Sequence, residues 1–294
     1  MTRPTLAELE RDCQKPDYRR LGNWMARRVT RPAALRVTWV VAPWGLSANG
    51  ATLLAWSCGV GAALALARGT PGSWLAAAAL LQLWYLLDHV DGQLARLRGT
   101  SSLDGVQLDF LMHHTMNLIV PLGAGHGAFV ASGEPVWLWV GATWGIASLL
   151  ITLHHDARYK TFITRLKRFR GLLEVHGGAG DRPVPPPRVP RHAARLAAWA
   201  ARKMCETHVV MNVLSILAVT AWLAGDSRLW LGRGYLTLVA VLSVGVAAVT
   251  LVRSQHAQAA EREFAAWFRP RPGERLAYRE GWWTVEAEDE NGRT

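Results

Sequence analysis

Cysteine and acidic residues are scarce in this sequence. Only 3 of the 294 residues are cysteine, Cys13, Cys58 and Cys205, and their odd number and wide spacing argue against a disulfide framework and against a zinc site. Acidic residues number 22 against 33 lysines and arginines, so the net charge is +11. Residues 1–40 are mostly polar and charged, and we expect no cleavable signal peptide there.

Hydrophobic residues, in contrast, make up 50% of the chain, and 15 residues are tryptophan. A nucleic-acid-binding protein would explain the positive charge, but its basic residues would lie on a polar folded domain. Here the lysines and arginines flank long apolar runs, which is typical of membrane spans joined by basic loops. We therefore expect a protein that contacts membrane lipid and has no nucleic-acid partner.

Six apolar stretches are long enough to cross a bilayer, which takes about 20 helical residues. They lie at 50–67, 72–90, 106–125, 135–154, 207–224 and 229–252. The basic stretch 12–36 has interleaved apolar residues and is typical of an amphipathic helix on the membrane surface. The predicted fold class is therefore all-α, an integral membrane protein with six transmembrane helices and an N-terminal surface helix.

Basic residues are concentrated on one side of these spans. They fall in residues 1–45, 91–105, 155–206 and 253–294. The positive-inside rule then places both termini and the loop between the second and third spans in the cytoplasm, in a multi-pass protein of the cell (inner) membrane. The expected organisation is a cytoplasmic region 1–45, a transmembrane catalytic domain 46–254 with a flexible linker 172–192, and a cytoplasmic tail 255–294.

The most informative stretch begins where the second apolar span ends. It reads Asp88-x2-Asp91-Gly92-x2-Ala95-Arg96-x8-Gly105-x3-Asp109-x3-His113. Helical spacing puts the first five of these residues on one stripe and the last three on another, so that carboxylates from two helices can converge. Converging carboxylates repel each other unless a cation lies between them, and such oxygen ligands suit divalent ions that clamp phosphates.

Three further residues of this stretch suit a nucleotide. Gly92 and Gly105 leave the backbone uncovered where a nucleotide could lie close, and Arg96 supplies a planar donor fork for a phosphate. A simpler interpretation stays open, in which Asp88 and Asp91 only cap a membrane helix at the water interface.

This stretch resembles the signature of the CDP-alcohol phosphotransferases, integral-membrane enzymes whose pattern is Asp-x2-Asp-Gly-x2-Ala-Arg-x8-Gly-x3-Asp-x3-Asp. Every fixed position matches except the last, where His113 replaces Asp. The resemblance implies that an acceptor hydroxyl displaces CMP at the β-phosphorus of a CDP-linked donor, in phospholipid or phosphodiester biosynthesis. It also implies a homodimer and two divalent ions, Mg²⁺ or Mn²⁺, bound by Asp88, Asp91, Asp109 and His113.

A second short element supports this resemblance. In the run from Ser47 to Thr52, Asn49 and Thr52 match the Thr-Pro-Asn-x-x-Thr element that precedes the first span in the family, although the Thr-Pro pair is missing. The alternative is a helix start capped by Ser47 or Asn49. The predicted CDP-binding residues are Asn49, Thr52, Asp88, Gly92, Ala95, Arg96 and Gly105.

His113 is the position at which the chain departs from the family. Histidine can act as a general base, and it suits Mn²⁺ or Zn²⁺ better than Mg²⁺. Our first hypothesis is that His113 is the catalytic base that deprotonates the acceptor. The base could instead be His114, His89 or the group 154–156, or the chain could have lost activity.

The donor and acceptor are less well defined by the sequence. The default donor is CDP-diacylglycerol, as in most bacterial members of the family. The stretch 15–17 and the basic residues after it resemble members that join a CDP-polyol to a polar or phosphorylated polyol, and Arg158 and Lys160 could contact an anionic acceptor or anionic lipid. A small transporter is the alternative from another class, but it predicts internal repeats, which are not found.

Overall fold

The computed structural model describes residues 5–14, 18–20, 22–176 and 189–287, and it is mainly helical. The stretch 15–17 and most of the predicted linker 172–192 lie outside these residues. The long helices are α3 (Ala48–Ala67), α4 (Pro71–Leu97), α5 (Leu103–Ser132), α6 (Val136–Leu166), α8 (Thr207–Ala224) and α9 (Trp230–His256). Shorter helices are α1 (Leu6–Cys13), α2 (Arg31–Val41), α7 (Ala193–Met204) and α10 (Ala259–Trp267).

Four of the described helices, α3, α6, α8 and α9, are long and apolar enough to cross a membrane. They coincide with four of the six predicted spans. The other two predicted spans fall in α4 and α5, which are longer than a bilayer requires and carry the polar motif at their adjoining ends. Spanning by α4 and α5 therefore stays a prediction.

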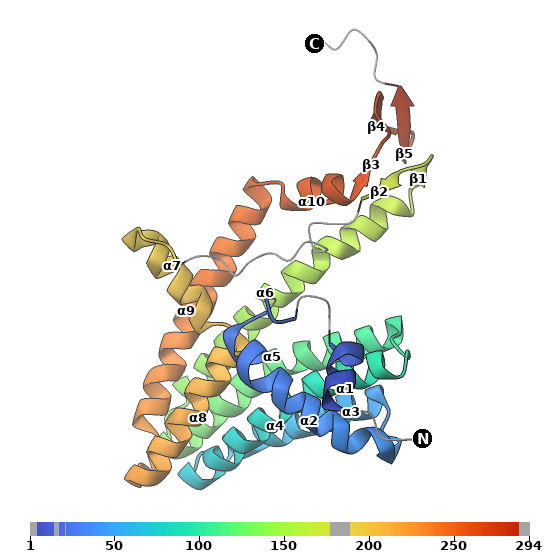
Figure 1. Cartoon of the computed structure of the whole chain (residues 1–294). Coiled ribbons are helices and arrows are strands. Elements are labelled where there is room, and N and C mark those ends of the chain that lie inside the picture. Colours follow the sequence, from blue (N-terminus) through green and yellow to red (C-terminus); the bar gives the residue numbers. More distant parts are fainter. Residues whose placement is uncertain (1–4, 15–17, 21, 177–188, 288–294) are drawn as a thin grey trace. The chain divides into compact units, whose positions relative to one another are not determined.

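The chain divides into two compact units. The first contains the described residues of Met1–Leu150 and Pro185–Ala247, and the second those of Ile151–Val184 and Ala248–Thr294. In the first unit α3 packs along both α4 and α5, and α4 also packs against α8 (Figure 1). Small residues permit this close packing, because Gly123 and Gly127 of α5 face the carbonyls of Ala63 and Leu66 with no room for a Cβ atom.

Local sequence sets the ends of the helices that carry the motif. Ser47 caps α3 by accepting a hydrogen bond from the Gly50 amide at 3.0 Å, which confirms the predicted helix start. Ser102 caps α5 in the same way, accepting from Gly105 at 3.1 Å. Between α4 and α5, Gly99 has a φ of +63°, which allows the tight turn that points both helix ends at the same region.

The N-terminal region packs on the motif end of α4. Leu9, Cys13 and Leu35 are buried together, and Leu97 of α4 packs against them. The predicted surface helix is in fact three described pieces, α1, a π-helical turn (Ala26–Thr30) and α2, and both α1 and α2 contact α4. Met25 and Leu35 of this stretch thus pack against protein, whereas Trp24 and Val29 are exposed.

The all-α expectation needs one correction, in the second unit. Here β5 (Trp282–Ala287) pairs with β4 (Glu274–Arg279) and with β1 (Phe169–Arg170), and β2 (Glu174–Val175) pairs with β3 (Phe268–Arg269). Phe162 and Phe264 form the buried aromatic centre. The described part of the predicted tail is therefore folded, because β-prone aromatic residues such as Trp282 and Trp283 pair across a hairpin.

Candidate active site

The adjoining ends of α4 and α5 bring two carboxylates and an imidazole together. His113 Nε2 lies 3.0 Å from Asp88 Oδ1 and 3.4 Å from Asp109 Oδ1. Asp109 and His113 are one helical turn apart on α5, and Asp88 reaches them from α4. The Trp84 and His113 rings pack edge to face, with 5.9 Å between their centroids. Two helical faces thus converge as their spacing predicts.

Asp91 takes a different environment from Asp88. Only 7% of it is exposed, and Oδ2 accepts a hydrogen bond from the Thr52 hydroxyl at 2.7 Å. Its other oxygen accepts from the amide of Gly92. Thr52, which was predicted to contact the nucleotide, therefore also orients this carboxylate.

A first cleft, with about 650 Å³ of open space, lies over the carboxylate–imidazole cluster. It is lined by Gln14, Arg31, Asp88, His89, Asp91, Gly92, Gln93, Arg96, Asp109 and His113. Gln14 and Arg31 come from the N-terminal region and were not identified from the sequence. A contact between segments far apart in the sequence brings Gln14 and Arg31 to this cleft. The basic character of residues 12–36 was the one feature of the sequence that could have suggested a role for Arg31.

A second cleft, of about 740 Å³, adjoins the first. Its lining includes Asn49, Thr52, Asp91, Gly92, Ala95, Arg96, Gly105 and Asp109. Six of the seven residues predicted to bind CDP therefore line one cleft, and the seventh, Asp88, lines the first cleft. A Cβ atom on Gly105 would lie 3.3 Å from Asn49 Oδ1, so glycine keeps this wall open.

Arg96 stands between the two clefts and lines both. Its Nε donates a hydrogen bond to the carbonyl of Cys13, which fixes the guanidinium from the N-terminal side. A Cβ atom on Gly92 would lie 3.2 Å from Arg96 Nη1. Gly92 therefore leaves room for the arginine as well as for a ligand.

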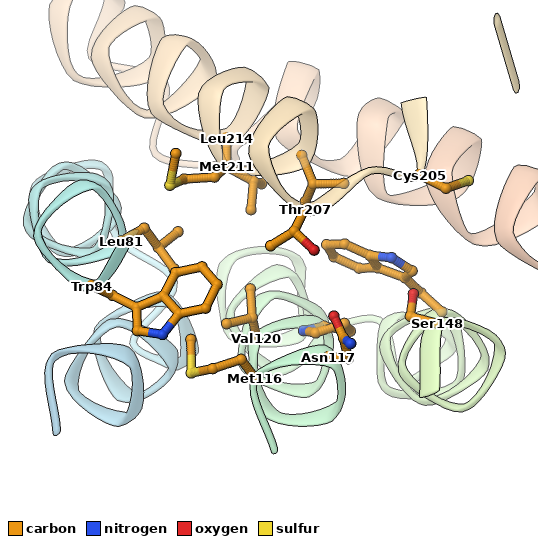
Figure 2. A pocket seen from close by; sticks show the side chains of 13 residues that line it. Leu81, Trp84, Met116, Asn117, Val120, Ser148, Cys205, Thr207, Met211 and Leu214 are labelled. Atoms are coloured by element: carbon orange, nitrogen blue, oxygen red, sulfur yellow. The ribbon is translucent and has the colours of Figure 1, made fainter. Parts of the chain in front are cut away.

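A third, small cavity lies among α4, α5, α6 and α8. Its lining combines apolar side chains such as Trp84, Met116 and Met211 with the neutral polar residues Asn117 and Thr207. Figure 2 shows the Asn117 amide and the Thr207 hydroxyl facing the cavity from α5 and α8. Asn117 is one helical turn beyond His113. Trp84 lines this cavity and also packs against the His113 ring, so the cavity lies next to the cluster.

The donor set of the cluster suits a divalent cation. One donor atom each from Asp88, Asp109 and His113 lie within 4.8 Å of one another, close enough to share one ion. Carboxylate oxygens suit Mg²⁺ and Mn²⁺, and the added nitrogen shifts the preference toward Mn²⁺ or Zn²⁺. The chemistry of these residues is therefore compatible with the predicted metal.

Other predicted contacts fall in the second unit. Arg158 pairs with Glu263 at 3.0 Å, and Lys160 is exposed. His155 lies 3.7 Å from Asp156. In the first unit, the alternative base His89 lines the first cleft, and its Nδ1 lies 2.9 Å from the Tyr85 carbonyl.

Long apolar helices and a carboxylate–imidazole cluster beside two clefts define a membrane protein with an enzyme-like site. Residues 46–168 match the family model of CDP-alcohol phosphatidyltransferase. The match supports assignment of this part of the chain to that family, and with it a phosphotransferase with a CDP-alcohol donor. No match was found among curated proteins.

Proposed function

We propose that this protein transfers a substituted phosphate group from a CDP-linked donor to an alcohol at a membrane and releases CMP. The observation that carries the proposal is that Asp109 and Arg96 line both clefts. A donor nucleotide in the second cleft would present its diphosphate where the two clefts join. The acceptor hydroxyl would then approach through the first cleft.

The chain's own residues have distinct roles in this reaction. Arg96 binds the diphosphate through its donor fork, and Asn49 and Gly105 shape the space for the nucleotide. Asp88, Asp91 and Asp109 would hold a divalent cation, which stabilises negative charge on the diphosphate and on departing CMP. Gln14 and Arg31 of the N-terminal segment form part of the wall of the first cleft.

His113 is assigned to proton transfer. The sequence predicts it both as base and as metal ligand, but a neutral imidazole has a single ring lone pair and cannot fill both roles at once. A proton on Nε2 would be donated to Asp88 at 3.0 Å, so the carboxylate would fix the tautomer. Nδ1 would then carry the lone pair that accepts the acceptor's proton, as in other carboxylate–histidine pairs.

The donor is proposed to be a lipid, with CDP-diacylglycerol as the default. The four helices that are long and apolar enough to cross a membrane support this choice, because a lipid donor would be present in the membrane beside them. The concentration of basic residues in the loops on the motif side supports a cytoplasmic active site. As a second candidate, Arg31 in the first cleft favours an anionic acceptor such as a phosphorylated polyol, with a CDP-polyol donor.

The test is CMP release by the purified full chain with Mg²⁺ or Mn²⁺, a panel of CDP-linked donors and a panel of neutral and phosphorylated alcohols. We expect CMP and the matching phosphodiester to appear together. His113→Ala should lower turnover by about 10²- to 10⁴-fold, which is the usual contribution of a general base. Full turnover in His113→Ala would refute the assignment of the base, and an absence of CMP with every donor would favour an inactive member or a transporter.

A further inference from the structure

The position of His113 bears on how many cations the site can hold. Its Nε2 lies 3.0 Å from Asp88 Oδ1 and 3.4 Å from Asp109 Oδ1. One oxygen of each carboxylate therefore faces the imidazole. A pair of cations about 3.5–4 Å apart clamps a phosphate only when carboxylate oxygens bridge or flank both ions.

Asp91, the third carboxylate, has few lone pairs left to bind a cation. Asp91 accepts one hydrogen bond from Thr52 at 2.7 Å and another from the Gly92 amide. Both of its oxygens are thus partly used within the protein. The second oxygens of Asp88 and Asp109 are left to bind an ion whose coordination shell waters or phosphate would complete, as is usual for Mg²⁺.

The charge of the ligands also favours a single divalent cation. Carboxylates that bind a metal are ionised, and three of them carry three negative charges, so one divalent cation leaves the site negative and a second would make it positive before any phosphate arrives. An aspartate at position 113 would add the fourth negative charge that balances two divalent cations. A neutral imidazole adds no negative charge.

We propose that His113 takes the place of a second cation, so that this site binds one divalent ion per chain. The inference rests on the proposed function, because it concerns the metal of the same reaction. It differs from the sequence prediction of two ions. The reason is the single residue at which the chain departs from the family signature.

The experiment is a Mn²⁺ titration of the metal-free full chain in lipid nanodiscs, with bound metal counted by elemental analysis and its environment followed by electron paramagnetic resonance. We expect one Mn²⁺ per chain with the six-line spectrum of an isolated ion. Two Mn²⁺ per chain, with the spectrum of an exchange-coupled pair, would overturn the inference while leaving the proposed function intact. No bound Mn²⁺ at all would overturn both.

The matched variant is His113→Asp, which restores the fourth carboxylate. We expect it to bind two Mn²⁺ and to give the exchange-coupled spectrum. A folded His113→Asp that binds one ion would contradict the role given to His113. Because the wild-type count does not depend on this variant, misfolding of the variant leaves the test decisive.

Discussion

The hydrogen bond from Thr52 to Asp91 gives a prediction whose size can be worked out. The two groups meet at 2.7 Å, with Thr52 only 4% and Asp91 7% exposed. A hydrogen bond to a charged group contributes about 1.5–3 kcal/mol. If Asp91 must be ionised and oriented to act on the diphosphate, Thr52→Val should lower kcat/KM by about 10- to 150-fold, since about 1.4 kcal/mol corresponds to a factor of ten.

The assay is kcat/KM for CMP release at saturating cation. Thr52→Ser keeps the hydroxyl and should retain most activity. Ser57→Ala removes a hydroxyl from the exposed side of the same helix, where it donates to the Leu53 carbonyl at 2.9 Å, and should behave as wild type. If Thr52→Val were as active as Ser57→Ala, the role of Thr52 in orienting Asp91 would be wrong.

Three further predictions concern other contacts. Arg96→Lys should raise KM for the donor about tenfold in the CMP assay, because a point charge cannot replace the planar fork. Arg233→Met should lower the free energy of unfolding by about 1–2 kcal/mol and leave kcat unchanged. The Arg233 side chain is only 7% exposed, and its Cζ lies 4.7 Å from the Trp137 ring centroid and 4.6 Å from that of Trp230. Hydrogen bonds from Arg165 lower the pKa of Glu261, so their stabilisation is present above the ordinary glutamate pKa and lost as pH falls through the lowered value. Glu261→Gln should make stability less dependent on pH in acid unfolding followed by tryptophan fluorescence. A pH profile identical to that of the wild type would contradict this role of Glu261.

The meeting of α4 and α5 at the cluster could be predicted because it depends on local spacing. Asp109 and His113 are one turn apart on a single helix, and the turn at Gly99 joins that helix to the one that carries Asp88. The second cleft follows from the same short connection, with Asn49 placed at the start of α3 by its serine cap. Helical periodicity and capping are properties of neighbouring residues, so sequence alone determines them.

Contacts between distant segments could not be predicted in this way. The placement of Gln14 and Arg31 over the cluster depends on packing between the N-terminal helices and α4. The same holds for the short strands of the second unit, where β1 pairs with β5 more than one hundred residues later in the sequence. A local sequence pattern does not predict such pairings, because whether a short polar segment forms a strand depends on the segment against which it packs.

The central claim is that the carboxylate cluster supports cation-dependent transfer of a phosphodiester. The most direct measurement follows CMP and transferred product together, from a labelled CDP-linked donor, in the wild type and in Asp109→Asn, with Mn²⁺ or with a chelator. The account predicts equal amounts of CMP and product in the wild type, none with the chelator, and a loss of about 100-fold or more in Asp109→Asn. CMP release that persists with the chelator, or in Asp109→Asn at the wild-type rate, would contradict it.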